Sequence, residues 1–197
     1  MPKIAAENIE VHVRRQTERI LDASAQLFTQ NGYRATDLGK IAASAGLARN
    51  SLYRYFASKD HILVAVLQRE MQPFIARTMT LADANPNPAT RIDAWLDLQM
   101  ELATGPCHAM IKMLGDMTDA SDDLHAEIRS LHVPPREALE TAVGELLVDS
   151  DRDARVVSAM IASMVQSAGG LAMGETDADA VVNELKTSVR SILASGD

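Results

Sequence analysis

The sequence predicts an all-α protein. Apolar residues recur every three or four positions over most of the chain, and no stretch alternates polar and apolar residues for long enough to indicate a β-strand. No internal repeat of solenoid length is visible. A chain of 197 residues can bury about 70% of the surface of its unfolded form, so it can fold without disulfides or structural metals.

Three helices are expected in the first sixty residues. A first helix carries an apolar stripe up to Asn31 and Gly32, a pair that commonly stops helices. A short second helix places on one face Ile41, Ala42 and Ala45. Gly46 supplies the left-handed backbone position that ends this helix. The apolar stripe then restarts with Leu47, Leu52 and Phe56.

Two short helices joined by a tight corner make a helix-turn-helix, which places its second helix in the DNA major groove. The residues of this second helix that point away from the apolar stripe can all reach base edges, and they are Arg49, Asn50, Tyr53 and Arg54. Contacts to phosphate oxygens, which fix register without reading sequence, are expected from Thr36, Lys40, Ser51, Tyr55 and Lys59.

Residues 14–70 resemble the N-terminal DNA-binding domain of the TetR family of bacterial transcriptional repressors. The stretches that carry the resemblance are 20–28 (ILDASAQLF), 31–33 (NGY), 41–46 (IAASAG) and 52–56 (LYRYF), followed by Ser58 and Lys59. Family members often have Ser or Thr where Ala48 stands, and loss of that helix cap costs about 0.5–2 kcal/mol. Many relatives also carry Arg where this chain has Gly39, so a base contact made there by some of them is absent.

Charge is distributed unevenly along the chain. Residues 1–60 carry nine Lys or Arg and six Asp or Glu, whereas the remainder carries ten and twenty-one, for a net charge of −8. A basic domain can dock on phosphates while an acidic body faces away from the duplex, which makes binding sensitive to salt. A merely soluble acidic surface would explain the C-terminal excess equally well.

The rest of the chain is expected to form a second helical domain. A long helix starts after Ser58 and contains Pro73, which should kink it. The one obvious linker, Asn-Pro-Asn-Pro, lies at residues 85–88. Further helices are expected at 91–103, 106–117, 122–132, 135–148, 153–171 and 177–193. We therefore expect a helix-turn-helix domain in residues 1–60 and a helical ligand-binding and dimerisation domain in residues 61–197.

The last two long helices carry wider apolar surfaces than one core-facing stripe needs, together with small residues that permit close helix approach. Pairing with a second copy would form a four-helix interface, and the family resemblance implies the same two-fold homodimer. DNA geometry favours it too, because one short recognition helix reads few bases. The expected interface residues are Val157, Met160, Ile161, Met164, Leu185, Val189 and Ile192. The alternative is that these helices pair only within one chain.

Several methionines accompany the single tryptophan in the second domain. Flexible thioethers suit a cavity that adapts to apolar ligands, although ordinary core packing explains any one of them. The residues expected to line a pocket are Trp95, Met100, Met110 and Met113, with His108 as a polar contact.

Two histidine or cysteine pairs raise catalytic and metal alternatives. Cys107 precedes His108, and His125 lies two turns from His132, but neither pair has a third partner at a recognisable spacing. The single cysteine excludes an internal disulfide. No signal peptide or bilayer-spanning apolar run is visible, so we expect a cytoplasmic protein without cofactor, metal or membrane partner.

The sequence thus predicts a ligand-responsive transcriptional regulator, in the first place a repressor. It would bind a palindromic double-stranded DNA operator as a homodimer and leave it when a small apolar or amphipathic effector binds. Two other classes of function fit parts of the sequence. An interaction protein could retain the helix-turn-helix only as a fold, and a small hydrolase or redox enzyme could use Cys107 and His108, for which the sequence offers no third orienting group.

Overall fold

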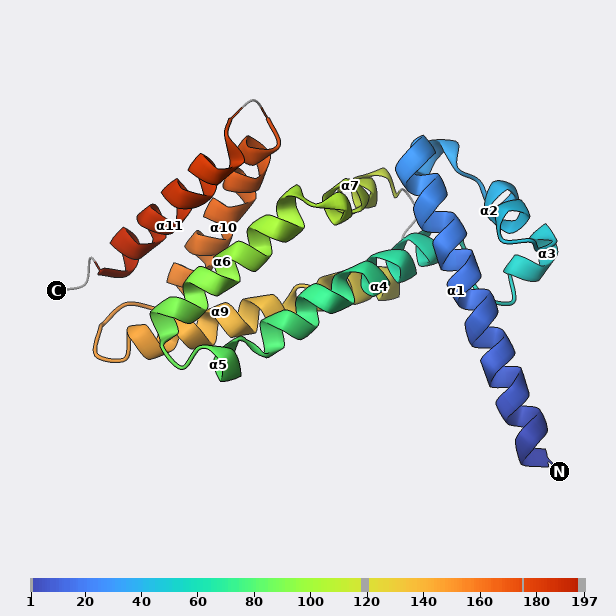
Figure 1. The fold of residues 1–197 in the computed structure, drawn as a ribbon, viewed down its shortest axis with the longest axis horizontal. Coiled ribbons are helices and arrows are strands. Elements are labelled where there is room, and N and C mark those ends of the chain that lie inside the picture. The colour runs from blue at the N-terminus through green and yellow to red at the C-terminus, as the bar shows by residue number, and fades with distance from the viewer. Residues whose placement is uncertain (1, 118–120, 175, 195–197) are drawn as a thin grey trace. The chain divides into compact units, whose positions relative to one another are not determined.

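The computed structural model describes residues 2–117, 121–174 and 176–194, and Figure 1 shows them as a succession of helices. These residues contain eleven α-helices, one short 3₁₀ helix and no β-strand. The predicted all-α class is therefore confirmed. None of the described helices combines the length and the apolar character that crossing a bilayer requires.

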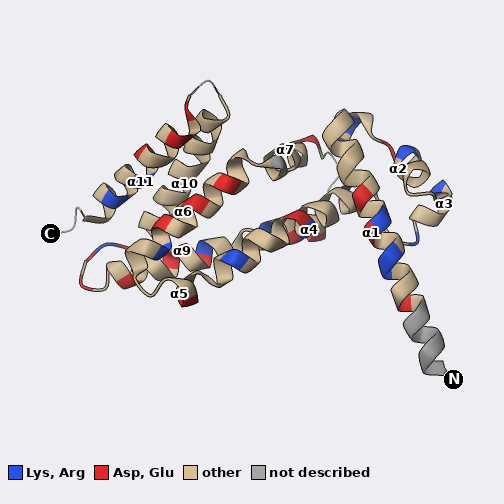
Figure 2. Ribbon diagram, viewed as in Figure 1, with Lys and Arg blue, Asp and Glu red and all other residues tan. Residues whose placement is uncertain are grey.

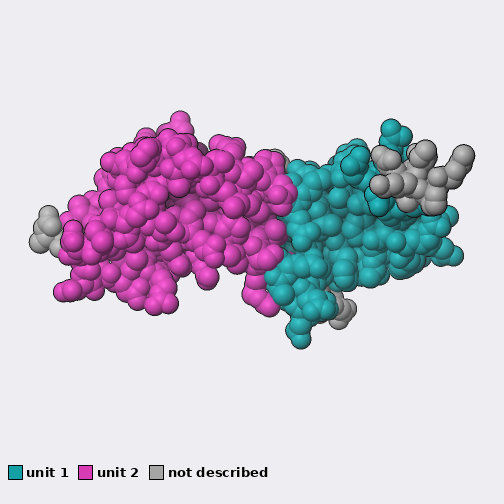
Figure 3. Space-filling model, turned by 90° about the horizontal axis from the view of Figure 1, so that it is seen from below, with its two compact units in different colours: residues 1–70, 109–127 teal, residues 71–108, 128–197 magenta. Residues whose placement is uncertain are grey.

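The chain divides into two compact units, which Figure 3 colours separately. Unit 1 consists of residues 1–70 and 109–127, and unit 2 of residues 71–108 and 128–197. This division differs from the expected boundary after residue 60, because residues 61–70 also belong to unit 1 and because side chains of residues 110–117 pack into the N-terminal core. Met110 is buried there, and the partly buried side chains beside it include Ile111, Met113, Leu114 and Met117.

Unit 1 contains the predicted three-helix arrangement. The three predicted helices are α1 (Pro2–Ala35), α2 (Leu38–Ser44) and α3 (Arg49–Leu52), and the first part of α4 (Lys59–Met79) packs with them. The side chains that hold them together are fully buried and include Ile20, Phe28, Ile41, Leu52 and Leu63. Burying each contributes about 1.5–3 kcal/mol, which stabilises helices as short as α2 and α3 that would not persist alone.

The predicted stop at Gly32 is present inside the long first helix. Gly32 has φ 77° and ψ 167°, so the helical backbone is interrupted there before α1 ends at Ala35. A residue without Cβ adopts this conformation without steric cost. The short segment after Gly32 carries Tyr33 and leads directly to Thr36 and the start of α2.

Unit 2 is built from the end of α4, α5 (Leu81–Ala84), α6 (Pro88–Thr104), α9 (Val133–Leu146), α10 (Ala154–Ala172) and α11 (Ala178–Ala194). Its buried core includes Ile92, Trp95, Leu96, Leu139, Val143, Ile161, Val165, Leu185 and Val189. At Gly169 a Cβ would lie 2.8 Å from the Cβ of Ala103, so α10 and α6 approach each other too closely for any side chain there. Gly169 therefore serves close packing within the chain, as the sequence predicts.

The predicted linker positions the start of α6. The Asn87 side chain accepts hydrogen bonds from the backbone N–H groups of Ala89, at 2.9 Å, and Thr90, at 3.3 Å. Pro88 occupies the first turn, where its missing N–H is not needed. The helix that follows carries Arg91, Ile92 and Trp95 on its buried side.

Three helices contribute residues to both units: α4, α7 (Pro106–Met113) and α8 (Asp122–Ser130). The 3₁₀ helix η1 (Leu114–Asp116) lies between the last two along the chain and belongs wholly to unit 1. α4 continues as one helix through Pro73. The two units are therefore joined by continuous helical backbone at three points of the chain, and not only by α4.

Candidate DNA-binding site, ligand pocket and dimer face

The corner between α2 and α3 is fixed at both ends of α2. The Asp37 carboxylate accepts a hydrogen bond from the Lys40 backbone N–H at 3.0 Å and caps the helix. This backbone hydrogen bond lowers the pKa of Asp37, so the cap stays charged. At the other end Gly46 has φ 70°, and the Leu47 N–H donates to the Ala42 carbonyl at 2.8 Å. This geometry holds α3 in one orientation relative to α2.

The four side chains predicted to read bases are all exposed. The helix is shorter than predicted and ends at Leu52, which is fully buried, while Phe56 beyond it is half-buried; these two side chains fix the segment on the core. Figure 2 shows Lys and Arg along α1, α2 and α3. Within the described part of the chain, Arg49 and Arg54 form no ion pair, so their donors are available to a ligand such as a base edge. As expected, Ala48 provides no side-chain cap for α3.

The predicted phosphate contacts divide into two groups. Lys40 is exposed, with its Nζ 2.7 Å from the Ala35 carbonyl, while Ser51 and Tyr55 are half-buried at the edge of α3. Thr36 is 1% exposed, and its hydroxyl donates to the Gly32 carbonyl at 2.8 Å. A hydroxyl buried inside the domain cannot reach a phosphate, so the assignment of Thr36 to DNA is corrected.

Lys59, also predicted to contact phosphate, makes contacts within the domain that the sequence did not indicate. Its Nζ donates to the backbone carbonyls of Tyr33, at 2.8 Å, and Thr36, at 2.9 Å, and lies 3.9 Å from the centre of the Tyr33 ring. Burial lowers the pKa of Lys59, although Asp60 and Asp37 act in the opposite direction. The ammonium thus ties the end of α1 to the start of α4. A lysine close to helix-terminal carbonyls is a known capping pattern, but the carbonyls here are distant in sequence.

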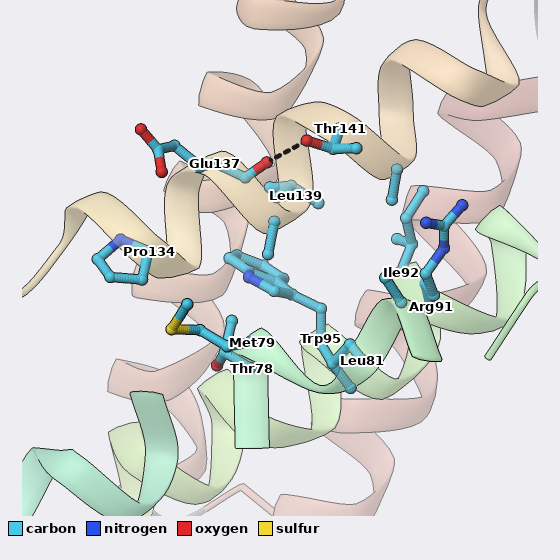
Figure 4. Close-up of a pocket in the computed structure, with 13 residues that line it drawn as sticks. Thr78, Met79, Leu81, Arg91, Ile92, Trp95, Pro134, Glu137, Leu139 and Thr141 are labelled. Carbon is cyan, nitrogen blue, oxygen red and sulfur yellow. Dashed lines mark hydrogen bonds between the residues drawn. The ribbon is translucent and has the colours of Figure 1, made fainter. Parts of the chain in front are cut away.

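Unit 2 contains a pocket of about 230 Å³, shown in Figure 4. It is lined by the end of α4, α5, α6 and α9, and the Trp95 ring lies at its centre. Arg91 also lines it, with a side chain only 9% exposed and an Nη2 that donates to the Glu145 carboxylate. Apolar walls come from Met79, Leu81, Ile92, Pro134 and Leu139.

Of the residues predicted to line a pocket, only Trp95 does so. Met100 is buried in the same core as Trp95 but does not reach the pocket, and His108 is not among the lining residues. Met110 and Met113 pack in the core of unit 1 instead. The sequence signal that was missed is Arg91, a charge that stands four residues before Trp95 on the apolar stripe of α6.

The predicted dimer residues fall on two sides of α10 and α11. Four of them are buried in the core of their own chain: Val157, Ile161, Leu185 and Val189. These four assignments are corrected, because their side chains pack within unit 2. Met160 is 54% exposed, whereas Met164 and Ile192 are half-buried. The exposed apolar face also includes Val156 and Leu171, at 56% and 57%, which the prediction omitted.

The catalytic and metal alternatives gain no support in the described residues. No group of three or more His, Cys, Asp or Glu among them could hold a metal ion. Cys107 is buried, with 5% of its surface exposed, which is unfavourable for a nucleophile that must reach a substrate.

Comparison with protein families concerns the helix-turn-helix. Residues 20–66 match the model described as bacterial regulatory proteins, tetR family. The DNA-binding region of this chain is therefore that of the tetR family of bacterial regulatory proteins, as the resemblance predicts. The matched segment contains α2, the Gly46 corner and α3, which are the elements that fix and present the exposed residues of α3.

Curated proteins similar to this chain match the same N-terminal part. The HTH-type transcriptional repressor KstR of Mycolicibacterium smegmatis is 39% identical over 80 residues, which are 41% of this chain and 39% of KstR. The fatty acid metabolism regulator protein of Bacillus subtilis is 37% identical over 59 residues, 30% of each protein. The aligned stretch therefore spans well under half the length of the curated relatives it matches.

Solved structures share the fold of this chain over nearly its whole length. The transcriptional regulator FadR from Bacillus subtilis, in complex with stearoyl-CoA, has a TM-score of 0.70 at 23% identity and covers 91% of this chain and 98% of its own. AibR, in complex with isovaleryl coenzyme A and operator DNA, has a TM-score of 0.69 at 20% identity and covers 88% and 97%. At these identities the likeness concerns the fold.

Proposed function

We propose that the protein is a ligand-responsive DNA-binding transcriptional regulator that acts as a repressor. The observation that carries the proposal is the exposure of Arg49 and Asn50 in α3, and of Tyr53 and Arg54 in the turn that follows it, beside a rigid corner. Arg pairs with guanine and Asn with adenine in the major groove, and neither arginine is engaged by a carboxylate in the described chain. KstR, one of the curated relatives that match this domain, is named a transcriptional repressor, which supports the same role.

The proposed DNA-binding species is a homodimer on a palindromic operator. A recognition helix as short as α3 reads few bases, so a second copy one DNA turn away is needed for specificity. We assign the interface to the exposed face of α10, where Val156, Met160 and Leu171 are uncovered and no charged residue follows Arg155. Small residues between them, Ala159, Ser163, Ser167 and Gly170, are also exposed and allow a partner helix to approach closely.

The proposed effector site is the pocket around Trp95. Its walls are mainly apolar, which suits an apolar or amphipathic small molecule. Two structures of the same fold were solved with acyl-coenzyme A ligands, which supports a regulator controlled by a small organic ligand. Such a ligand releases DNA only if it binds the DNA-free conformation more tightly.

The test is specific DNA binding by the full chain. Fluorescence anisotropy would be measured on DNA from upstream of its own gene and on random DNA of equal length. Arg49→Ala and Asn50→Ala should each reduce the preference for the specific site by about 1–3 kcal/mol. The control is Arg129→Ala, which removes an exposed arginine of α8 and should leave the preference intact. Equal losses on specific and random DNA would refute the reading face, and no specific binding to any fragment of a genomic library would refute the function.

A further inference from the structure

Arg91 is a buried cation whose hydrogen-bonding capacity is only partly used. Its side chain is 9% exposed, and its Nη2 donates to the carboxylate of Glu145. In the described part of the chain, neither Nε nor Nη1 has a hydrogen-bond partner, and Nε is fully buried. A guanidinium offers five donors, and donors left unpaired in a buried site each carry a desolvation cost. This pattern is expected of a group that completes its hydrogen bonds with a ligand.

The other polar groups that line the pocket are already engaged. The Trp95 Nε1 donates to the Pro135 carbonyl at 2.7 Å. The Thr78 hydroxyl donates to the Phe74 carbonyl at 2.8 Å, and the Thr141 hydroxyl donates to the Glu137 carbonyl at 2.8 Å, the bond drawn in Figure 4. Among the lining residues, unused donors therefore belong to Arg91.

The carboxylates near the pocket are exposed to water and do not prevent an anion from binding beside Arg91. Glu137, the one carboxylate among the lining residues, is exposed, and in Figure 4 its carboxylate points away from Trp95 on the side opposite Arg91. Glu145, the partner of Arg91, is 45% exposed and thus partly screened by water. The guanidinium is more buried than either carboxylate. A ligand anion beside it would therefore be attracted by Arg91 more strongly than it is repelled by the water-screened carboxylates.

We propose that the effector is a compact apolar carboxylic acid, with its carboxylate on Arg91 and its hydrocarbon body against Trp95, Ile92 and Leu139. This inference deepens the proposed function by naming the ligand class of the same pocket. A planar guanidinium matches a carboxylate in a two-point contact, which a neutral amide or ester cannot replace. Since an apolar cavity of about 150 Å³ holds benzene, a pocket of about 230 Å³ suits an acid only moderately larger, such as octanoate.

The test uses the fluorescence of Trp95, the only tryptophan of the chain, on the full protein without DNA. The probes are octanoate, octanamide and octanoyl-CoA. Octanoate should bind at least about tenfold more tightly than octanamide, because the amide cannot form the charge-assisted pair. Arg91→Gln should abolish this preference while leaving octanamide binding unchanged, and Arg91→Lys should restore part of it. Arg136→Gln, which removes an arginine that is 68% exposed on α9, is the matched control and should keep the full preference.

Several results would overturn the proposal. Equal affinities of the native protein for acid and amide, or no binding of octanoate at millimolar concentration, would exclude a carboxylate anchor. Binding of octanoyl-CoA without octanoate would assign the site to an acyl thioester instead. Thermal unfolding shows whether Arg91→Gln is folded. If it is not, the proposal is tested by comparing the affinities for octanoate and octanamide in the native and Arg91→Lys proteins. None of these measurements involves DNA, so the proposed function can fail or hold independently.

Discussion

Lys59 and Arg49 are both cations near the helix-turn-helix, but their surroundings give them different tasks. Lys59 is half-buried, and its ammonium donates hydrogen bonds to two backbone carbonyls at 2.8 and 2.9 Å. Arg49 is exposed and forms no ion pair in the described chain. Sequence identifies both as basic residues of a DNA-binding motif. It cannot show that the end of α1 folds back to within reach of Lys59, because that contact joins residues 26 and 23 positions apart.

We therefore predict that Lys59→Ala lowers the free energy of unfolding, by about 1–3 kcal/mol, because two carbonyls lose a charged donor. Denaturant unfolding followed by circular dichroism would measure this. Lys40→Ala, the control, removes an exposed lysine and should leave stability nearly unchanged while lowering the slope of DNA affinity against salt by about one per half-site. The prediction is wrong if Lys59→Ala is as stable as the native protein and lowers the salt slope of DNA affinity as much as Lys40→Ala does. Lys59 would then be a phosphate contact.

At the level of elements, α10 shows why an apolar helix is difficult to interpret from sequence. Val157, Ile161 and Val165 form one stripe that packs in the core of unit 2. Val156 and Met160 form a second stripe that is exposed. Both have helical spacing, so periodicity predicts that the helix is apolar on two sides but not which side faces its own chain. That choice is made by the packing of α6, α9 and α11 against α10.

This distinction predicts opposite outcomes for two aspartate substitutions. Met160→Asp places a charge on the exposed face, so it should keep the fold and shift the protein from dimer to monomer. Val189→Asp places an unpaired charge in a core position that is 1% exposed, and should prevent stable folding. Light scattering at micromolar concentration gives the mass, and circular dichroism gives the fold. A native protein that is monomeric, or a Met160→Asp protein that remains fully dimeric, would remove α10 from the interface.

For the whole molecule, local features were predictable and long-range ones were not. The all-α class, the glycine-limited corner at Gly46 and the exposed positions on α3 follow from spacing within a few residues. The packing of Met110 into unit 1 and the placement of Arg91 in a pocket with residues of α9 depend on contacts between distant segments. A single sequence carries no direct record of such contacts, so neither was found before the structure.

In the proposed function, ligand and DNA are linked through helices that contribute residues to both units. α4 contributes Thr78 and Met79 to the pocket. The same helix begins at Lys59, which is hydrogen-bonded to carbonyls at the end of α1 and just after it. α7 and α8 also have residues in both units. A ligand that favours one arrangement of these continuous helices can therefore bias how two copies of α3 meet successive major grooves.

The prediction is reciprocity between the pocket and the operator. If the effector weakens DNA binding by some factor, operator DNA must weaken effector binding by the same factor, typically about 5- to 150-fold. Titrations of octanoate and octanoyl-CoA, followed by Trp95 fluorescence, would be repeated with and without saturating operator. Random DNA of equal length, added at the same concentration, is the control that should leave ligand affinity unchanged. Because linkage is a thermodynamic requirement, identical affinities in the native protein with and without operator would reject control by this pocket, even if both ligands bound.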